Sequence, residues 1–411
     1  MKNNISFLID QIETGGAEKM LLRLADYFSE LYDSHVFPAV ESKGYAHYNV
    51  SRLNLHKFTK LNESGKLSKF YNFFCWLFYL AFHYKKLKPI ISISFLERSN
   101  VANVIICRLF KIKSVISVRN NLEAQYRDKP KIIRKIIYGI LGFFYRRADL
   151  IVVVADQLQE QLILNLRLND QKLITIYNPQ PVKKFQSLAK HTIKNSEIEN
   201  FIKDKKSIIT VGRLTEQKGL HHLIRSFRKV HSAQPNTVLL ILGEGQLKFE
   251  LQLLIDEMQL GDVIKMFNYE INPYAILDKC TVFAFPSLWE GIANALLEAI
   301  AVGKTVVTTD CLTGPRELLG YSIDCPPIKS PVRLACGSII PEMEKEKYGG
   351  EDLTQSETFL AEELLYYLSD EHQYDGEHGK KIAQNFNDNL IMQKWHKTVN
   401  DLLINTETVS K

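Results

Sequence analysis

Two cations in the second half of the sequence have the types and spacing needed to bind a diphosphate. Arg213 and Lys218 stand five residues apart in VGRLTEQKG, directly after the β-branched run KSIIT, and Gly212 and Gly219 flank them. Ligands of open α/β sheets bind at the carboxyl ends of the strands, where a guanidinium fork and an ammonium match two phosphate groups. An exposed loop with two unrelated cations is the alternative.

Two carboxylates stand in an otherwise apolar, helix-forming segment, PSLWEGIANALLEAIAVGK (residues 286–304). Glu290 precedes a glycine, and Glu298 follows eight residues later inside the predicted helix. Carboxylates accept hydrogen bonds from hydroxyl groups, so the pair is suited to two parts of one extended, hydroxyl-rich ligand. The start of the helix adds backbone N–H groups that favour anions, those of Gly291, Ile292, Ala293 and Asn294.

A glycine pair near the N-terminus is a further candidate phosphate loop. Gly15 and Gly16, in ETGGAEK, permit close backbone approach at the start of a predicted helix. The segment is not a Gly-x-Gly-x-x-Gly fingerprint, and no acidic residue follows at the distance needed to bind a dinucleotide ribose. The pair alone predicts a phosphate loop no better than it predicts a simple tight turn.

No metal centre is predicted from the sequence. The chain contains no Asp-x-Asp that would hold a divalent ion on a diphosphate, and its six cysteines form neither a Cys-x-x-Cys pair nor a Cys/His ligand pattern. The cysteines are typical of reduced structural thiols. Charge on a departing diphosphate would then be stabilised by Arg213, Lys218 and helix N-termini.

Short β-branched runs alternate with helical segments in both halves of the chain. Continuous apolar runs such as KSVISV (113–118) and TVLLIL (237–242) are typical of strands buried on both faces, and their alternation with helices predicts parallel, doubly wound sheets. The prolines of NPQP (178–181) interrupt the pattern, which predicts an N-terminal domain over 1–181 and a C-terminal domain over 182–389. The helix expected in 390–411 either ends the second domain or packs back on the first.

The 411-residue chain has a net charge of +6 that is unevenly distributed. Residues 1–180 hold 26 Lys and Arg against 15 Asp and Glu, and residues 57–147 alone hold 19 against 4. Within 57–147 these cations alternate with long aromatic and aliphatic runs, which suits an anionic membrane surface or a lipid diphosphate better than nucleic acid. We therefore expect no nucleic-acid partner.

The longest apolar run, Phe70–Tyr84, leaves two interpretations open. It is shorter than the roughly 20 residues needed to cross a bilayer. It is either a buried core helix or a helix that lies in the membrane interface. The N-terminus lacks the charged-then-apolar pattern of a signal peptide, so we expect a cytoplasmic protein that is peripheral on the inner face of the plasma membrane.

Taken with LGEG, NPY and GPREL, the motifs GGAEK, VGRLTEQKG and EGIANALLE resemble glycosyltransferase family 4 over nearly the whole chain. The resemblance implies the GT-B fold, an α/β architecture in which two Rossmann-like, doubly wound parallel-sheet domains face each other across a cleft. The C-terminal domain would hold a nucleotide sugar. The resemblance also implies retaining transfer without a metal or other cofactor, because the nucleotide-diphosphate sugar is itself a substrate.

The resemblance further implies roles for single residues. Arg213 and Lys218 would neutralise the donor diphosphate. Glu298 would accept hydrogen bonds from the ribose hydroxyls, and Glu290 would face the transferred sugar. Backbone groups of residues 292–294 would contact that sugar or the phosphate, and the glycine pair at 15–16 would close over the diphosphate from the other domain.

Two arginines are candidate contacts of a different kind. Many relatives have a histidine in the loop after KSVISV, where this chain reads RNN. Arg119 in that loop and Arg98 in FLERSN are therefore candidate contacts for an acceptor or donor phosphate. Structural loop cations are the alternative at both positions.

These observations predict a retaining glycosyltransferase. It would move a hexose or N-acetylhexosamine from a nucleotide-diphosphate sugar, with UDP favoured, to a lipid-diphosphate-linked oligosaccharide in the biosynthesis of a surface polysaccharide such as O-antigen or capsule. Its partners would be the donor, the lipid-linked acceptor and the anionic inner leaflet. A nucleotide-sugar epimerase of the same architecture and a non-catalytic sugar-nucleotide-binding scaffold are the alternatives.

Overall fold

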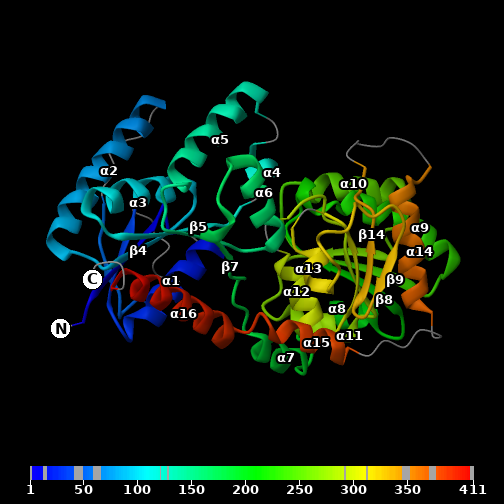
Figure 1. Ribbon diagram of the computed structural model, residues 1–411. Coiled ribbons are helices and arrows are strands. Elements are labelled where there is room, and N and C mark those ends of the chain that lie inside the picture. The colour runs from blue at the N-terminus through cyan, green and yellow to red at the C-terminus, as the bar shows by residue number, and fades with distance from the viewer. Residues whose placement is uncertain are drawn as a thin grey trace. The chain divides into compact units, whose positions relative to one another are not determined.

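The computed structural model describes residues 2–12, 16–40, 50–58, 66–120, 122–126, 129–290, 293–311, 313–344, 352–369 and 376–407. The chain forms two compact units (Figure 1). Unit 1 comprises Met1–Pro179 and Asn389–Lys411, and unit 2 comprises Gln180–Asp388. The chain therefore passes from one unit to the other at 179–180 and returns at 388–389. The predicted boundary after residue 181 lies two residues beyond the first crossing.

Unit 1 is built on a seven-stranded sheet with the order β3-β2-β1-β4-β5-β6-β7, in which all neighbouring strands are parallel. The order reverses between β1 and β4, and this switch point is where open α/β sheets bind ligands. The strands are β1 (Asn4–Ile9), β2 (Asp33–Pro38), β3 (Asn54–Leu55), β4 (Ile91–Phe95), β5 (Lys113–Val118), β6 (Leu150–Val153) and β7 (Leu173–Thr175). The helices are α1 (Gly16–Ser29), α2 (Lys66–Leu87), α3 (Glu97–Phe110), α4 (Leu122–Tyr126), α5 (Lys131–Tyr145), α6 (Asp156–Leu166) and α16 (Asp388–Glu407).

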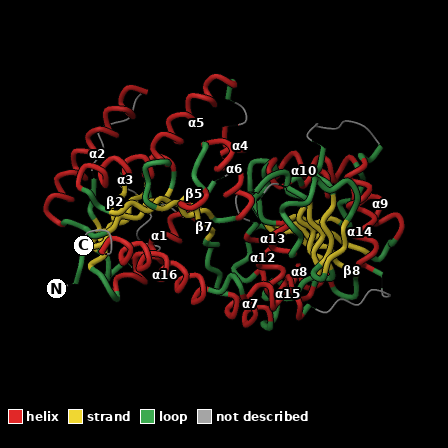
Figure 2. The backbone as a smooth tube through the Cα atoms, in the orientation of Figure 1, coloured by secondary structure: helices red, strands yellow, loops and turns green. Residues whose placement is uncertain are grey.

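Helices cover both faces of the unit 1 sheet. Figure 1 and Figure 2 show α1 and α16 on one face and α2, α3 and α5 on the other. The apolar side of α16 joins the core that contains Phe7 and Phe28, through Ile391, Met392, Trp395 and Val399. The C-terminal helix thus packs on unit 1 because its apolar residues complete that core.

Strand β4 shows how polar residues fit a strand that is buried on both faces. Ser92 and Ser94 are fully buried. The Tyr84 hydroxyl lies 2.7 Å from Ser92 Oγ, and Asn103 Nδ2 donates to Ser94 Oγ at 3.1 Å. These hydrogen bonds offset the burial cost of the serine hydroxyls and fix α2 and α3 against the sheet.

Unit 2 is built on a second seven-stranded sheet with the order β10-β9-β8-β11-β12-β14-β13, parallel except for the pair β13 and β14. Its switch point lies between β8 and β11. The strands are β8 (Lys206–Val211), β9 (Thr237–Leu242), β10 (Ile264–Phe267), β11 (Val282–Phe285), β12 (Thr305–Thr309), β13 (Val332–Leu334) and β14 (Gly337–Ile340). The helices are α7 (Val182–Ala189), α8 (Ser196–Ile202), α9 (Leu220–Ala233), α10 (Lys248–Glu257), α11 (Pro273–Lys279), α12 (Asn294–Ala301), α13 (Pro315–Leu319), α14 (Gln355–Leu368) and α15 (Glu377–Gln384).

The apolar run at Phe70–Tyr84 is neither wholly core nor wholly surface. In α2, Trp76, Leu80 and Tyr84 are buried, whereas Phe78 and other residues on the opposite side are exposed. Among the described residues, no helix has the length and apolar character that a membrane crossing requires. Helix α2 is therefore a core helix on one side and leaves an uncovered apolar stripe on the other.

Candidate functional site

Two of the predicted site residues are in direct contact in unit 2. Lys218 ends the short 3-10 turn Glu216–Lys218 between β8 and α9, and Glu290 lies in the loop between β11 and α12. The Lys218 Nζ atom is 2.7 Å from Glu290 Oε1. Gln217 Nε2 donates to Glu290 Oε2 at 3.2 Å and to the Trp289 carbonyl at 2.9 Å. Since β8 and β11 are neighbours, the two loops meet at the carboxyl ends of the switch-point strands.

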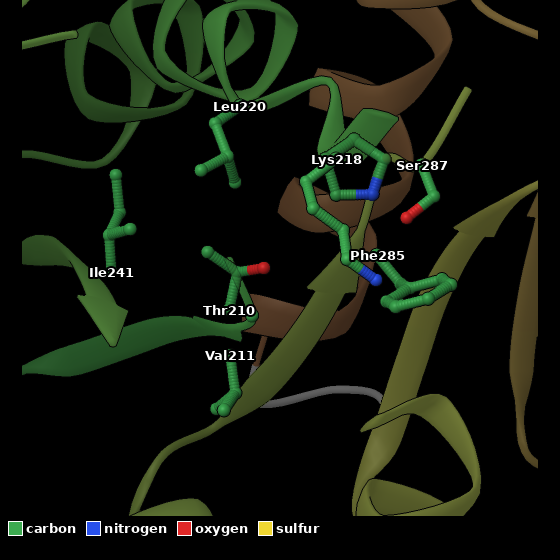
Figure 3. Close-up of a pocket in the computed structure, with 9 residues that line it drawn as sticks. Thr210, Val211, Lys218, Leu220, Ile241, Phe285 and Ser287 are labelled. Carbon is green, nitrogen blue, oxygen red and sulfur yellow. The ribbon is translucent and has the colours of Figure 1, made fainter. Parts of the chain in front are cut away.

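Lys218 lies along a pocket between these strands (Figure 3). Its ammonium is 5.0 Å from the centroid of the Phe285 ring, a favourable distance for a cation–π contact. A Cβ atom on Gly212 would lie 3.2 Å from Lys218 Cε, so glycine at this position leaves room for the lysine side chain. The pocket is lined by Thr210, Val211, Gly212, Lys218, Leu220, Ile241, Phe285, Pro286 and Ser287.

Glycines allow the loops of this site to pack backbone against backbone. Gly219 has a φ of +58°, and a Cβ atom there would lie 2.2 Å from the Pro286 carbonyl oxygen. Gly243, after β9, would place a Cβ atom 1.8 Å from the carbonyl oxygen of Gly212. Any other residue at either position would push the three loops apart, because its Cβ atom would overlap a main-chain carbonyl oxygen that cannot move without shifting the backbone.

The remaining donor-site predictions in unit 2 have different surroundings. Arg213 is exposed on the same loop as Gly212 and Lys218. Glu298 is partly buried on α12. Burial of Tyr274, and to a smaller extent the charge of Glu298, raises the pKa of Tyr274. The Tyr274 ring stacks on the Phe185 ring, with 4.5 Å between the two ring centroids. Asn294, the first residue of α12, accepts a hydrogen bond from Gln180 Nε2 at 2.9 Å.

Five further residues were predicted for the donor site. Ala293 is buried directly before α12, and its Cβ atom faces Gly314. Gly16 begins α1, and a Cβ atom added there would meet no other atom within 4 Å. Gly15, Gly291 and Ile292 lie outside the described residues.

A third loop, between β12 and α13, is hydrogen-bonded to the main chain of Glu290. Thr313 Oγ1 donates to the backbone carbonyl of Glu290. Arg316 forms a buried, two-bond pair with Asp310, each bond 2.6 Å long, which raises the pKa of the arginine. The GPREL motif contains Arg316, but the sequence pattern indicates no role for Arg316, Asp310 or Thr313. They hold the β12–α13 loop, and this loop in turn fixes the main chain at Glu290.

The two candidate arginines of unit 1 are held by aromatic rings. Arg119 is buried, with its guanidinium carbon 4.5 Å from the Phe95 ring centroid, and it donates to Asn178 Oδ1 and to Ser117 Oγ. Burial lowers the pKa of Arg119 to about 9, so it still carries its charge at neutral pH. The guanidinium carbon of Arg98 lies 5.9 Å from the Phe73 ring centroid. The Arg98 Nη2 atom is buried and has no hydrogen-bond partner among the described residues.

Two carboxyl groups near Arg98 were missed by sequence reasoning. Asp10 directly follows β1 and accepts a hydrogen bond from the backbone N–H of Ser99 at 3.0 Å. Glu97 opens α3, two residues after β4. Burial raises the pKa of both carboxyl groups. Their positions after adjacent strands of the unit 1 switch point are the signal that would have identified them.

Two family models match successive parts of the chain. The model of Glycosyltransferase Family 4 matches residues 14–182, and that of Glycosyl transferases group 1 matches residues 191–322. Among solved structures, HepE of Anabaena in complex with UDP has a TM-score of 0.74 at 17% identity, covering 98% of this chain and all of that one. The lipopolysaccharide outer core galactosyltransferase WaaB has a TM-score of 0.72 at 15% identity, covering 97% and 99%. These structural likenesses show the GT-B fold of two parallel-sheet α/β domains.

Sequence relatives extend over most of the chain. An uncharacterised glycosyltransferase of Methanocaldococcus jannaschii is 30% identical over 76% of this chain and 79% of its own length. A Campylobacter jejuni N-acetylgalactosaminyltransferase named for a diphospho-undecaprenol acceptor is 29% identical over 77% and 83%. The amylovoran biosynthesis glycosyltransferase AmsD of Erwinia amylovora is 24% identical over 77% and 84%. With both parts matched and these relatives aligned along most of its length, the chain belongs to glycosyltransferase family 4.

Proposed function

We propose that the protein is a retaining, metal-independent glycosyltransferase that uses a UDP-sugar as donor. It transfers a hexose or N-acetylhexosamine to a lipid-diphosphate-linked oligosaccharide on the inner face of the plasma membrane, in the assembly of a surface polysaccharide such as O-antigen or capsule. The contact between Lys218 and Glu290 is the observation that carries the proposal.

The closeness of Lys218 and Glu290 supports a nucleotide sugar as the ligand of this site. In such a donor the transferred sugar is bonded directly to the second phosphate. A phosphate-binding cation and a hydroxyl-binding carboxylate must therefore lie close together, and these two groups are 2.7 Å apart. Lys218 would contact the diphosphate, and Glu290 would accept hydrogen bonds from the sugar hydroxyls.

Stabilisation of the leaving diphosphate is the main chemical task of the proposed site. Lys218 on its short turn and Arg213 on the same loop supply two positive charges at the carboxyl end of β8. At an effective dielectric near 20, each close charge contact contributes up to about 4 kcal/mol before desolvation costs. Glu298 on α12 would bind the ribose hydroxyls. No metal or other cofactor takes part in the proposed reaction.

The proposed acceptor rests on a relative and on the charge of unit 1. The Campylobacter jejuni relative is named for an acceptor attached to diphospho-undecaprenol. Residues 57–147 of this chain, all in unit 1, hold 19 Lys and Arg against 4 Asp and Glu. A basic, aromatic-rich segment of this kind favours an acceptor that is presented at an anionic bilayer.

A transfer assay tests the proposal. The purified chain is incubated with individual UDP-hexoses and UDP-N-acetylhexosamines and with lipid-diphosphate-linked oligosaccharides, with and without EDTA. We expect a product whose new glycosidic bond has the anomeric configuration of the donor and whose yield does not depend on EDTA. An inverted product, or a reaction that EDTA abolishes, would contradict the retaining or the metal-independent part.

The same assay separates the alternatives. Conversion of the UDP-sugar to an epimer when no acceptor is present would identify an epimerase. A scaffold protein would turn over no donor at all, and its Lys218→Ala variant would still support polysaccharide production in cells. Lys279→Ala is the matched control, since Lys279 is an exposed lysine of the same unit that forms a long, 3.8 Å ion pair with the neighbouring Asp278.

A further inference from the structure

Helix α2 carries an uncovered stripe of aromatic side chains. Phe70, Phe74, Phe78 and Phe82 are spaced four residues apart, which places them on one side of the helix, and their exposed fractions are 65%, 43%, 76% and 70%. The opposite side of α2 packs on the core through Trp76, Leu80 and Tyr84. Large apolar side chains aligned in this way mark a contact surface more often than scattered single residues do.

Helix α5 carries a second stripe, made mainly of isoleucine. Ile132, Ile136, Ile140 and Phe143 follow helical spacing and are exposed by 73%, 57%, 51% and 47%. The other side of α5 is buried through Leu141, Gly142 and Tyr145. Both helices therefore pack apolar residues on unit 1 and also direct an apolar side away from its core.

The two stripes belong to one side of unit 1 because both helices flank α3. Trp76 and Leu80 of α2 share a core cluster with Ala102 and Ile106 of α3. On the other flank, the Tyr145 hydroxyl of α5 lies 3.3 Å from Asn100 Nδ2 of α3. Figure 1 shows α2 and α5 on the same face of the unit 1 sheet. We call the eight residues of the two stripes the two-stripe face.

The charge around the two-stripe face decides which partner it fits. Residues 66–88 hold five lysines, residues 129–147 hold six lysines and arginines, and neither segment holds an acidic residue. A second copy of this chain placed on this face would bring cations against cations. An anionic bilayer accepts both features, since its headgroups attract the cations and its acyl boundary receives the apolar side chains.

We propose that the two-stripe face docks unit 1 on an anionic membrane, with α2 and α5 lying side by side in the interface. The phenylalanines of α2 suit the boundary between headgroups and acyl chains, and the isoleucines of α5 suit the outer acyl region. Docking serves catalysis only if the acceptor is lipid-linked, and in that respect the proposal rests on the proposed function.

Vesicle flotation with the full chain tests the docking surface. The probes are vesicles of phosphatidylcholine alone and vesicles with about one third phosphatidylglycerol. We expect flotation only with the anionic vesicles, and at least tenfold weaker binding for Phe78→Ser/Phe82→Ser and for Ile132→Ser/Ile136→Ser. Phe249→Ser is the matched control, because Phe249 is 73% exposed on α10 of unit 2. Thermal unfolding confirms that each variant is folded, as expected for exposed positions.

Three outcomes would overturn the docking surface. Equal flotation of wild type and both double variants would exclude the two stripes as the contact. Equal binding to neutral and anionic vesicles would exclude the charge component. A dimer in analytical ultracentrifugation that both double variants dissociate would assign the face to a second copy of the chain.

A transfer assay with a water-soluble, short-chain acceptor distinguishes failure of docking from failure of the proposed function. Folded double variants should transfer sugar to this acceptor at the wild-type rate while losing transfer to acceptor embedded in vesicles. Membrane binding that depends on the stripes, with no transfer to either acceptor, would support the surface and contradict the proposed activity.

Discussion

The Lys218 ammonium lies 2.7 Å from the Glu290 carboxylate, although the two residues are 72 positions apart in the chain. The side chains of Glu290 and Lys218 are only 5% and 16% exposed, so the ion pair lies in a poorly solvated site. A ligand that attracts either group must therefore compete with, or join, this ion pair. A donor bound as proposed would therefore depend on the geometry of the two loops that carry the pair.

Glu290→Gln should reduce both activity and stability. The variant leaves the Lys218 ammonium without its carboxylate, so we expect a loss of about 1–3 kcal/mol in the free energy of unfolding. Removal of the sugar-binding charge should lower kcat/KM by roughly 10- to 100-fold, in line with about 1.5–3 kcal/mol for a charge-assisted hydrogen bond. Urea unfolding and steady-state kinetics measure the two effects. Wild-type kinetics in a folded variant would remove Glu290 from the site.

Gly219→Ala should disturb the site through the backbone. The φ of +58° costs a residue with a Cβ atom about 1–2 kcal/mol, and that atom would also collide with the Pro286 carbonyl oxygen. We expect a lower melting temperature together with weaker donor binding, because Lys218 is the neighbouring residue. Gly261→Ala is the control, since its Cβ atom would meet only Asp256 Oδ1 at 4.0 Å. Equal melting temperatures for both variants would contradict the close packing of these loops.

Gly16→Ala separates ligand contact from folding. A Cβ atom at Gly16 meets nothing within 4 Å, so the melting temperature should stay at the wild-type value. If the backbone at Gly16 approaches the donor diphosphate, the added methyl group should raise the KM for the donor several-fold. Gly139→Ala, on the exposed side of α5, is equally unhindered and should change neither quantity. An unchanged KM in both variants would argue against Gly16 as a donor contact.

Arg316→Met should be among the most destabilising single changes at this end of unit 2. It leaves the Asp310 carboxylate buried without its two-bond partner, a loss of about 3–5 kcal/mol in such pairs. The exposed pair of Lys229 and Glu362 provides the comparison, and Lys229→Met should change stability by at most about 1 kcal/mol. Denaturant midpoints of the two variants measure the difference. Similar midpoints would show that the β12–α13 loop does not depend on this pair.

Acid should destabilise the packing of α2 through a histidine cluster. Burial, with the charges of His35 and His83, lowers the pKa of His56 from 6.5 to about 4. Below pH 6.5 the unfolded chain binds a proton that the folded chain does not, so stability falls from pH 6.5 to about 4 and then levels off. His56→Phe keeps an aromatic ring beside Phe37 and should reduce this fall in melting temperature. Identical pH profiles would contradict the assignment.

The general fold could be predicted because the central strands are uninterrupted apolar runs. β5 and β9 follow such runs closely, and their parallel pairing follows from the helices between them. Strands β2, β3, β13 and β14 were not expected, because their sequences are short or polar and they form by pairing with stronger neighbours. Helices α7 and α8 form in a largely polar stretch after the domain boundary, where no continuous apolar run indicates a structural element.

The site could be predicted as motifs but not as contacts. The spacing within VGRLTEQKG and EGIANALLE indicated which loops carry charge, yet no local pattern shows that Lys218 pairs with Glu290. The same limit applies to Asp10 and Ser99, which are 89 residues apart and meet only because β1 and β4 are adjacent. Long-range pairs of this kind depend on sheet order, which sequence periodicity does not specify.

Calorimetric titration of UDP into the wild type, Lys218→Ala and Lys279→Ala tests the donor site most directly. We predict that the Lys218 variant binds UDP at least tenfold more weakly, because it loses a charge contact with the diphosphate, and that the Lys279 variant matches the wild type. Equal affinity in all three proteins would contradict the assignment of the diphosphate to this loop of unit 2.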